Sequence, residues 1–361
     1  MAPALTVVVQ TTSDCNLRCT YCYVRASRRS ITSIPLDALP TLVRNTAYGF
    51  DRVKFIWHGG EPLLSGRCFF ETALVTQVRL REHFGTEFEN VIQTNGTLLT
   101  DTWVDFLKEN DFRIGLSFDA PPAVHSAHRP PAGPGPGPEY YVDLFARLKR
   151  KGFHVGVLCV VSRHNVSLGR EVFEFFSQMG VDSYSLLPLS GMPLESCPEA
   201  PSDEELFDLF RTTFELWLAG GHGFKSIEPL DTMVRGLLGE PPSLCVFASS
   251  CLTRMIFITP DGSIVPCSSL VADEFVLGNV FAGTVREAMS GSRARRLRRQ
   301  RGLATAARCG HCAYVSICRG GCREDAYWHS GRYDGPYPYC GARKATFDYL
   351  RKRLTALLAA S

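Results

Sequence analysis

The amino-acid sequence contains no apolar run of the roughly 18 residues that a membrane-spanning helix needs. It has no repeat of fixed period and no excess of one charge, because 39 Lys and Arg stand against 36 Asp and Glu. The N-terminal segment MAPALTVVVQTTSDC has neither the basic part nor the long apolar part of a secretory signal. We therefore expect a cytoplasmic protein that binds neither membranes nor nucleic acid.

Cysteine is the residue in excess, with 14 in a chain of 361 residues. With 45% hydrophobic and 21% charged residues, the composition is otherwise that of a globular protein with one large domain or two ordinary ones. In a protein without a secretory signal, this many cysteines indicates metal or redox chemistry rather than disulfides.

The first half of the chain alternates strand-like and helix-like segments. Six apolar or β-branched runs predict strands: LTVVVQ (5–10), VKFIW (53–57), VIQT (91–94), RIGLSF (113–118), VGVLCVV (155–161) and YSLLPL (184–189). Helical patterns lie near 36–48, 67–83, 100–109, 140–151 and 168–179. This order is typical of an α/β fold with a parallel sheet covered by helices. In such folds reactive groups lie in the loops that follow the strands.

The second half is organised differently. A helix is expected near 203–219, and we place a domain boundary near residue 235, which gives domains 1–235 and 236–361. Little regular structure is predicted between Cys245 and Cys340, where metal is expected to replace part of the core. A helix is expected at the C-terminus.

Three shorter segments have distinctive compositions. RMIFITPDGSIVPC (254–267) predicts a β-hairpin with Asp261 in its turn. PPAGPGPGP (130–138) predicts a surface loop. The basic run SRARRLRRQR (292–301) is either a docking surface for an acidic partner or, as we prefer, a solvated helix face.

The loop after the first strand carries the motif C-x3-C-x2-C at Cys15, Cys19 and Cys22. Three thiolates hold three irons of a 4Fe-4S cluster and leave the fourth iron open to a ligand. A structural zinc site usually has four ligands, so zinc would need a distant fourth residue here. The count of three therefore favours a reactive cluster, with zinc as the alternative.

This motif resembles the signature of the radical S-adenosylmethionine (SAM) superfamily, and the resemblance extends over nearly the whole chain. It implies a partial (β/α)6 TIM-like barrel and a 4Fe-4S cluster whose open iron binds SAM. One electron then cleaves SAM to a 5′-deoxyadenosyl radical, which abstracts a hydrogen atom from the substrate. The resemblance also implies an electron donor such as flavodoxin or ferredoxin.

The resemblance assigns further residues to SAM. Gly59, Gly60 and Glu61 in WHGGEP match the family's GGE motif, which contacts the methionyl amine. Arg129 matches the arginine that pairs with the methionyl carboxylate, and Tyr21 matches an aromatic that packs on the adenine. Polar residues at strand ends are also expected to face the cofactor, although such residues often only cap helices. The remaining predicted cofactor contacts are Thr94, Asn95, Ser117, Asp119 and Leu187.

Eight further cysteines lie close together in the last third of the chain. They are Cys245, Cys251, Cys267, Cys309, Cys312, Cys318, Cys322 and Cys340. The pattern resembles the SPASM domain, which carries two auxiliary 4Fe-4S clusters. The resemblance implies one cluster on Cys245, Cys251, Cys267 and Cys322, and the other on Cys309, Cys312, Cys318 and Cys340. Zinc knuckles are the alternative, since C-x2-C pairs also bind zinc.

Three cysteines are left without a role: Cys68, Cys159 and Cys197. Cys159 lies within an apolar strand and is expected in the core.

Two auxiliary clusters occur mostly in relatives that modify peptides or proteins. The resemblance is closest to anaerobic sulfatase maturases, which oxidise Cys or Ser to formylglycine, and to Fxs-type maturases of ribosomal peptides. The chain departs from the sulfatase group in three places. Ser268 and Ser269 follow Cys267 where that group has an aspartate base, Val24 replaces a tyrosine, and His58 replaces a glutamine. Serine is a poor general base at neutral pH.

We therefore favour a maturase that oxidises side chains of a ribosomally made precursor peptide, with an aromatic-to-aliphatic cyclophane crosslink as the best single interpretation. His58 is a weak candidate for proton transfer, since it could equally only hydrogen-bond the cofactor loop. No dedicated leader-binding domain is expected. The alternatives are a sulfatase maturase, a small-molecule radical dehydrogenase and a non-catalytic iron-sulfur or zinc protein.

Overall fold

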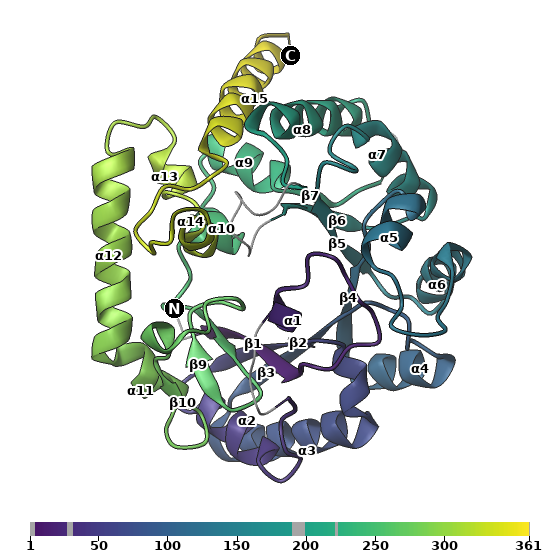
Figure 1. Cartoon of the computed structure of the whole chain (residues 1–361), viewed down its shortest axis with the longest axis vertical. Helices are drawn as coiled ribbons and strands as arrows, with labels where there is room; N and C mark the ends of the chain where they lie inside the picture. Colours follow the sequence, from purple (N-terminus) through teal and green to yellow (C-terminus); the bar gives the residue numbers. More distant parts are fainter. Residues whose placement is uncertain (1–3, 27–31, 190–198, 221–222, 361) are drawn as a thin grey trace. The chain divides into compact units, whose positions relative to one another are not determined.

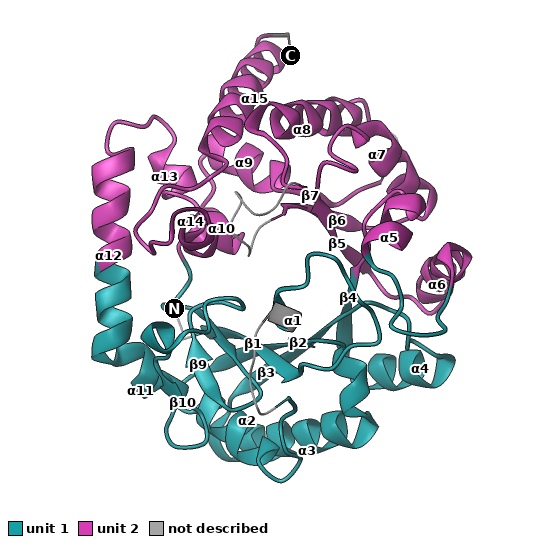
Figure 2. Ribbon diagram, viewed as in Figure 1, with its two compact units in different colours: residues 1–116, 129–136, 250–299 teal, residues 117–128, 137–249, 300–361 magenta. Residues whose placement is uncertain are grey.

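The computed structural model of the chain describes residues 4–26, 32–189, 199–220 and 223–360 (Figure 1). The chain divides into two compact units (Figure 2). Unit 1 comprises Met1–Leu116, Arg129–Pro136 and Ser250–Arg299, and unit 2 comprises Ser117–His128, Gly137–Ser249 and Gln300–Ser361. Cys197 lies outside the described residues.

Unit 1 is built on a mostly parallel sheet. Its strands are β1 (Ala4–Thr12), β2 (Arg52–Gly59), β3 (Glu87–Thr94), β4 (Phe112–Ser117), β8 (Met255–Ile258), β9 (Ser263–Val265) and β10 (Gly278–Asn279). Within this unit they run in the order β10-β9-β8-β1-β2-β3-β4. The register pairs Gln10 with His58 and Thr94 with Leu116, so the carboxyl ends of the first four strands meet at one edge of the sheet.

One face of this sheet packs under helices. These are α2 (Leu39–Ala47), α3 (Arg67–Phe84) and α4 (Asp101–Glu109). In β2 the side chains of Val53, Phe55 and Trp57 are fully buried, and Trp57 meets Phe69 and Phe70 of α3 edge-on. The alternate residues of β2 point to the opposite face, which therefore carries His58 at the end of the strand.

A buried polar triad lies within this apolar layer. Trp57 Nε1 donates to Asn90 Oδ1 at 2.9 Å, and the amides of Asn90 and Gln77 bond each other at 2.8 and 3.1 Å. All three side chains are at most 8% exposed. Because each polar group has a partner, the triad links β2, β3 and α3 without an unsatisfied donor.

Unit 2 contains the parallel strands β5 (Val155–Val161), β6 (Ser183–Pro188) and β7 (Ser226–Glu228), in the order β5-β6-β7. Its helices in this region are α5 (Pro122–His128), α6 (Pro138–Arg150), α7 (Gly169–Gln178), α8 (Asp203–Leu218) and α9 (Leu230–Leu237). Its core is rich in aromatic rings. The ring centres of Phe176 and Tyr184 are 4.8 Å apart, and those of Phe118 and Phe145 are 5.8 Å apart.

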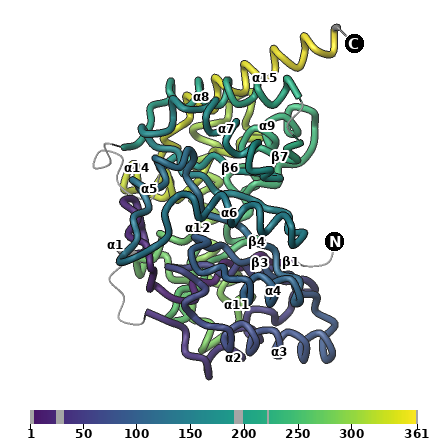
Figure 3. The backbone as a smooth tube through the Cα atoms, turned by 90° about the vertical axis from the view of Figure 1, so that its right-hand side faces the viewer, coloured from purple at the N-terminus to yellow at the C-terminus, as the bar shows by residue number. Residues whose placement is uncertain are grey.

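The rest of the cysteine-rich region is helical. It consists of α10 (Cys245–Ala248), α11 (Val285–Ser290), α12 (Ser292–Cys309), α13 (Val315–Cys318), α14 (Arg323–Ser330) and α15 (Cys340–Ala360). In unit 2, α15 lies beside α8 (Figure 3), where Arg353 and Tyr349 both bond Glu215 at 2.6–2.8 Å. The remaining short elements are α1 (Tyr23–Ala26), η1 (Pro62–Ser65) and η3 (Asp273–Phe275).

The predicted α/β class is confirmed, and β1 to β6 and helices α2, α3, α4, α6, α7 and α8 lie where the sequence predicts them. The β8–β9 hairpin also forms, with Asp261 accepting from Thr259 Oγ1 and Ser263 N in its turn. The boundary near residue 235 stays a prediction. Among the described residues, no helix has both the length and the apolar character needed to cross a bilayer.

The prediction of little regular structure between Cys245 and Cys340 is wrong, because α12 alone spans 18 residues. This helix lacks a hydrophobic stripe, so periodicity does not reveal it, but its Ala, Arg and Leu residues favour helix. In unit 1 its arginines bond backbone carbonyls: Arg293 contacts Val276 O at 2.6 Å and Arg298 contacts Leu252 O at 3.0 Å. These arginines therefore fasten the loops that surround Cys251 and η3.

We predict that Asn90→Ala lowers the free energy of unfolding by about 2–4 kcal/mol, because it leaves buried donors of Trp57 and Gln77 without a partner. Denaturant titration under anaerobic conditions measures the change. The control is Glu87→Ala, which removes an exposed ion pair with Arg52 and should change stability by less than about 1 kcal/mol. An equally small effect of both variants would contradict the prediction.

Candidate active site

The loop that follows β1 carries Cys15, Cys19 and Cys22, all half-buried. Burial raises the pKa of Cys15, although hydrogen bonds from Leu17 N and Asn95 partly oppose this. Cysteines bind metal as thiolates, and a bound cation would lower this pKa again. The loop is therefore suited to hold a metal group.

A turn after β2 holds the start of this loop through the backbone. Gly60 N donates to Thr12 O at 2.7 Å, and Glu61 N donates to Asp14 O at 2.8 Å. We call these two bonds the seam, because they join the turn to the strand end that precedes Cys15. The seam fixes the direction in which the cysteine loop leaves the sheet.

The two glycines of the turn are required by this close approach. A Cβ atom on Gly60 would lie 2.0 Å from Asp14 O, and one on Gly59 would lie 2.4 Å from Thr12 O. Gly59 also has a φ of +139°, which side-chain-bearing residues rarely adopt. A Cβ on Gly59 would thus meet the end of β1 and one on Gly60 the start of the cysteine loop, contacts that the sequence did not reveal.

The carboxylate of Glu61 lies at the centre of a buried network. It is 0% exposed. Its Oε1 accepts from Thr94 Oγ1 at 2.7 Å and from Leu63 N at 3.1 Å, and its Oε2 accepts from Asn95 N at 2.9 Å. Burial raises the pKa of Glu61 to about 7. The side chains of Glu61 and Thr94 therefore bond each other, and they join the ends of β2 and β3.

Asn95 connects that network to the cysteine loop. Its Nδ2 donates to Asn16 Oδ1 at 2.9 Å and lies 3.8 Å from Cys15 Sγ. Asn16 in turn donates to Thr97 Oγ1 at 2.7 Å. The loop is consequently held from the β3 end as well as from the β2 end.

A third segment holds the loop from a distant part of the sequence. Arg18 N donates to Pro130 O at 2.7 Å, and Ala132 N donates to Asn16 O at 2.9 Å. Residues 130–137 of the Pro- and Gly-rich stretch form a loop, as predicted, and Pro138 begins α6. Pro131 also forms a short bridge to Leu17 of the cysteine loop. The sequence signal that could have suggested this contact is the adjacent Arg129.

Arg129 and Tyr21, both predicted to contact SAM, lie together in unit 1. The guanidinium carbon of Arg129 is 5.4 Å from the centre of the Tyr21 ring. Both side chains are half-buried. The arrangement places a cation and an aromatic face beside the cysteine loop, and the contacts of both residues with SAM stay predictions.

His58 is the last side chain on the face of β2 that points away from helix α3. Its Nδ1 accepts a hydrogen bond from Gly59 N at 2.7 Å, so the proton of the neutral imidazole is on Nε2. Burial lowers the pKa of His58 to about 4, although the side chain is only half-buried by exposed area. His58 is therefore neutral near pH 7.

Three predicted cofactor contacts belong to unit 2: Ser117, Asp119 and Leu187. Asp119 is 1% exposed, and its Oδ1 accepts from Val160 N at 2.9 Å. Leu187 pairs in register with Val160 on the neighbouring strand. Asp119 and Leu187 thus both lie beside Val160, near the end of β5. Ser117 is half-buried at the end of β4.

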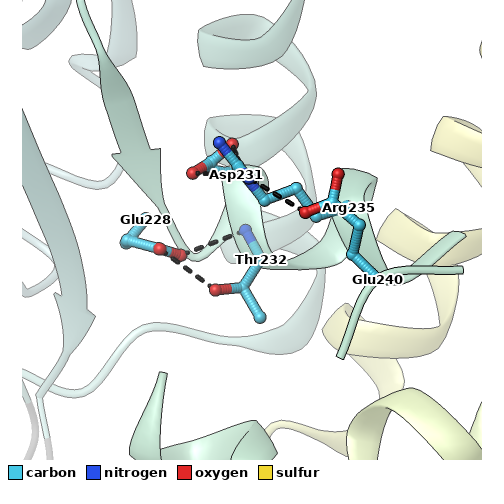
Figure 4. Close-up of polar contacts among 5 residues, drawn as sticks. All are labelled: Glu228, Asp231, Thr232, Arg235 and Glu240. Atoms are coloured by element: carbon cyan, nitrogen blue, oxygen red, sulfur yellow. Dashed lines mark hydrogen bonds and ion pairs between the residues drawn. The ribbon is translucent and has the colours of Figure 1, made fainter. Parts of the chain in front are cut away.

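Glu228 is a titratable residue at a strand end that the sequence reading missed. It ends β7 and pairs in register with Ser185 of β6. Figure 4 shows its carboxylate bonding Thr232 at the start of α9, with distances of 3.0 Å to Oγ1 and 3.2 Å to N. Burial raises the pKa of Glu228. A lone glutamate before a proline gives no sequence signal for this environment.

Four of the eight clustered cysteines come together in unit 2. Cys309, Cys312, Cys318 and Cys340 line one cavity of about 100 Å³. They come from the end of α12, the turn after it, the end of α13 and the start of α15. Burial, and after it the neighbouring thiols Cys318, Cys309 and Cys312, raises the pKa of Cys340. This mutual effect indicates four converging sulfurs that a cationic group would stabilise.

The other four do not all fall in one unit. Cys245 and Cys322 belong to unit 2, where they begin α10 and precede α14, whereas Cys251 and Cys267 belong to unit 1. Their shared cluster stays a prediction from the resemblance. Of the remaining cysteines, Cys68 is exposed and Cys159 is buried in β5, as expected for a core residue.

The spacing of the sulfurs bears on the zinc alternative. Within the described part of the chain, no three of these cysteine sulfurs lie within 4.8 Å of one another. A tetrahedral zinc with Zn–S bonds of about 2.3 Å holds its sulfurs about 3.8 Å apart. The sulfurs of this structure thus do not form the close triad of a preformed zinc site, and zinc stays the alternative to a 4Fe-4S cluster.

Two family models match the chain. Residues 9–184 match the radical SAM superfamily, and residues 245–313 match an iron-sulfur cluster-binding domain, SPASM. The cysteine-type anaerobic sulfatase-maturating enzyme of Clostridium perfringens (strain 13 / Type A) is 27% identical over 377 residues, which cover 98% of each chain.

Solved structures agree with this similarity. Native anSMEcpe with bound AdoMet and the Cp18Cys peptide matches with a TM-score of 0.85 and 26% identity over 98% of this chain and 99% of that one. Streptococcus suis SuiB bound to its precursor peptide SuiA matches with a TM-score of 0.67 and 16% identity over 95% of this chain and 76% of that one, which shows a shared fold. The similarity to sulfatase-maturating enzymes thus supports the sulfatase-maturase alternative better than the cyclophane interpretation.

We predict that Gly60→Ala costs the chain one cluster. Its Cβ would press on Asp14 O and open the seam, so iron per chain should fall from about twelve to about eight after anaerobic reconstitution. The control is Gly133→Ala, because a Cβ there meets nothing within 4 Å. Full iron in Gly60→Ala would show that the seam is dispensable.

We predict that Glu61→Gln lowers the melting temperature most at acidic pH. The amide would face the donor Asn95 N. In the wild type, a pKa raised from 4.5 to about 7 means that protonated Glu61 stabilises the fold below pH 4.5, and that this contribution is lost as pH rises through 7. The difference between wild type and variant should therefore shrink from pH 5 to pH 8. The exposed control Glu87→Gln should show no such trend, and a parallel pH profile for Glu61→Gln would refute the assignment.

Proposed function

We propose that the chain is a radical SAM enzyme with a SPASM domain and that it oxidises a cysteine or serine side chain within a peptide or protein to formylglycine. The observation that carries the proposal is the similarity to sulfatase-maturating enzymes, which extends over the full length of both chains. A match limited to the radical SAM region would support the radical chemistry alone. A match that includes the SPASM region supports a similar class of substrate.

The residues of unit 1 supply the first part of this activity. We assign Cys15, Cys19 and Cys22 to the radical SAM cluster, and the turn at Gly59–Glu61 to positioning the loop that holds it. When bound, the cluster and SAM supply a radical that removes a hydrogen atom from the substrate. Arg129 and Tyr21 would orient SAM through its carboxylate and its adenine.

The residues of unit 2 supply the second part. Cys309, Cys312, Cys318 and Cys340 fit an auxiliary 4Fe-4S cluster, because they line one cavity and supply four thiolate ligands. We assign the second auxiliary cluster to Cys245, Cys251, Cys267 and Cys322 on the resemblance. We further propose that a flavodoxin or ferredoxin supplies the electron that starts turnover.

A second candidate function is crosslinking of a ribosomally made precursor peptide. One observation favours it: Ser268, which is half-buried beside Cys267, stands where the sulfatase group has an aspartate base. Val24, where that group has a tyrosine, is 5% exposed and offers no hydroxyl. If the chain makes formylglycine, another group must accept the substrate proton.

The test is to incubate the reconstituted enzyme with SAM, a reductant and peptides that contain Cys or Ser in a sulfatase-like context. We expect 5′-deoxyadenosine and a peptide aldehyde that reacts with a hydrazide probe. Cys15→Ala should abolish both products while leaving the auxiliary clusters in place.

The second candidate predicts a different product. A crosslinked peptide loses two hydrogens but gives no aldehyde, so hydrazide labelling separates the two reactions. Turnover with a small metabolite and with none of the peptides would overturn both.

A further inference from the structure

Two arginines are buried in the wall of the cavity that Cys309, Cys312, Cys318 and Cys340 line. Arg323 is 4% exposed and Arg343 is 8% exposed. Both belong to unit 2, as do the four cysteines. Arginine is rarely buried to this extent unless an anion compensates its charge.

Arg343 is held rigidly against one of the cysteines. Its guanidinium lies 4.2 Å from the ring centre of Phe247 and 4.0 Å from that of Tyr337. Its Nη2 donates to Tyr337 Oη at 2.9 Å, and its Nη1 points to Cys318 Sγ at 3.6 Å. The two aromatic rings leave the guanidinium little freedom, so it stays directed at the sulfur.

Arg323 directly follows Cys322, which precedes α14, and faces the same cavity. Its Nη1 donates to Gly335 O at 3.1 Å, and its Nη2 donates to Gly320 O. Its Nε is buried and has no hydrogen-bond partner. The carboxylate whose charge acts on Arg343 is that of Asp325.

The proposed cluster resolves this imbalance. Four thiolates around an oxidised 4Fe-4S core carry a net double negative charge, which becomes triple when the core takes up one electron. Two buried cations stabilise the triple charge more than the double charge, because charge interactions are strong where water is excluded. A hydrogen bond from Arg343 to Cys318 acts in the same direction, since such bonds to the sulfurs raise cluster potentials.

We propose that Arg343 and Arg323 raise the reduction potential of the cluster at Cys309, Cys312, Cys318 and Cys340, so that it is the auxiliary cluster that takes up an electron first. In the step concerned, the oxidised cluster gains the electron that the substrate radical loses, and the proton that the substrate loses passes to water. The proposal rests on the proposed function, because it presumes the cluster in this cavity. In this proposal the two arginines act only through their charge on the cluster and do not contact the substrate.

The experiment is a redox titration of the full chain monitored by electron paramagnetic resonance. Cys15, Cys19 and Cys22 are changed to Ala in every sample so that only the auxiliary clusters respond. Arg343→Met preserves most of the side-chain volume and removes the charge. We expect the equilibrium constant for one reduction step to fall at least about tenfold, a shift of about 59 mV to lower potential. The other step should not move, and it serves as an internal control.

The matched control is Arg308→Met. Arg308 lines the same cavity but is exposed, so solvent screens its charge. We expect a much smaller shift. Arg343→Lys keeps a charge without the planar fork and should give an intermediate value. If Arg343→Met does not fold, Arg323→Met is judged by the same criterion.

The outcomes test the role of the arginines and the presence of the cluster separately. About eight irons per chain with unmoved potentials in Arg343→Met would overturn the role of the arginines and leave the proposed function intact. Equal shifts in Arg343→Met and Arg308→Met would also overturn it, since burial would then not matter. Failure of the unmodified cavity to bind iron would overturn the cluster assignment itself.

Discussion

The candidate active site depends on the seam between the end of β1 and the turn after β2. Two backbone hydrogen bonds, from Gly60 to Thr12 and from Glu61 to Asp14, fix the chain immediately before Cys15. They can form only because two residues without side chains occupy the turn. The buried Glu61 network and the bridge to residues 130–132 then hold the same loop from two further directions. A loop held in this way can present three thiolates without a regular element of its own.

Charge has a comparable role in the cysteine-rich part of unit 2. There the cavity wall combines four thiols with buried guanidinium groups, an arrangement that is costly without a bound group and favourable with one. The physical argument is the same as for small metal-binding domains, in which ligands and metal replace part of an apolar core. Binding of the cluster and folding of this region should therefore be coupled.

The residue that follows Cys267 distinguishes this chain from the sulfatase group. The full-length similarity supports a sulfatase-maturase-like oxidation, yet Ser268 removes the carboxylate that the resemblance would make the base. Glu228 in unit 2 is a carboxylate with a raised pKa at the end of a strand, but its oxygens cap the start of α9. The chain thus carries the cysteine motif expected for the radical step, whereas Ser268 does not supply the base that would accept the substrate proton.

The sequence by itself determined the features that are encoded locally. The spacing of Cys15, Cys19 and Cys22, the alternation of strands and helices, and the hairpin around Asp261 each depend on neighbours within a few residues. Only the tertiary structure decided that Gly60 faces Asp14, that residues 130–132 bridge to the cysteine loop, and that Arg343 is enclosed between Phe247 and Tyr337. These contacts join segments that are far apart in the chain. Their existence depends on how the segments pack, which no local pattern of residues encodes.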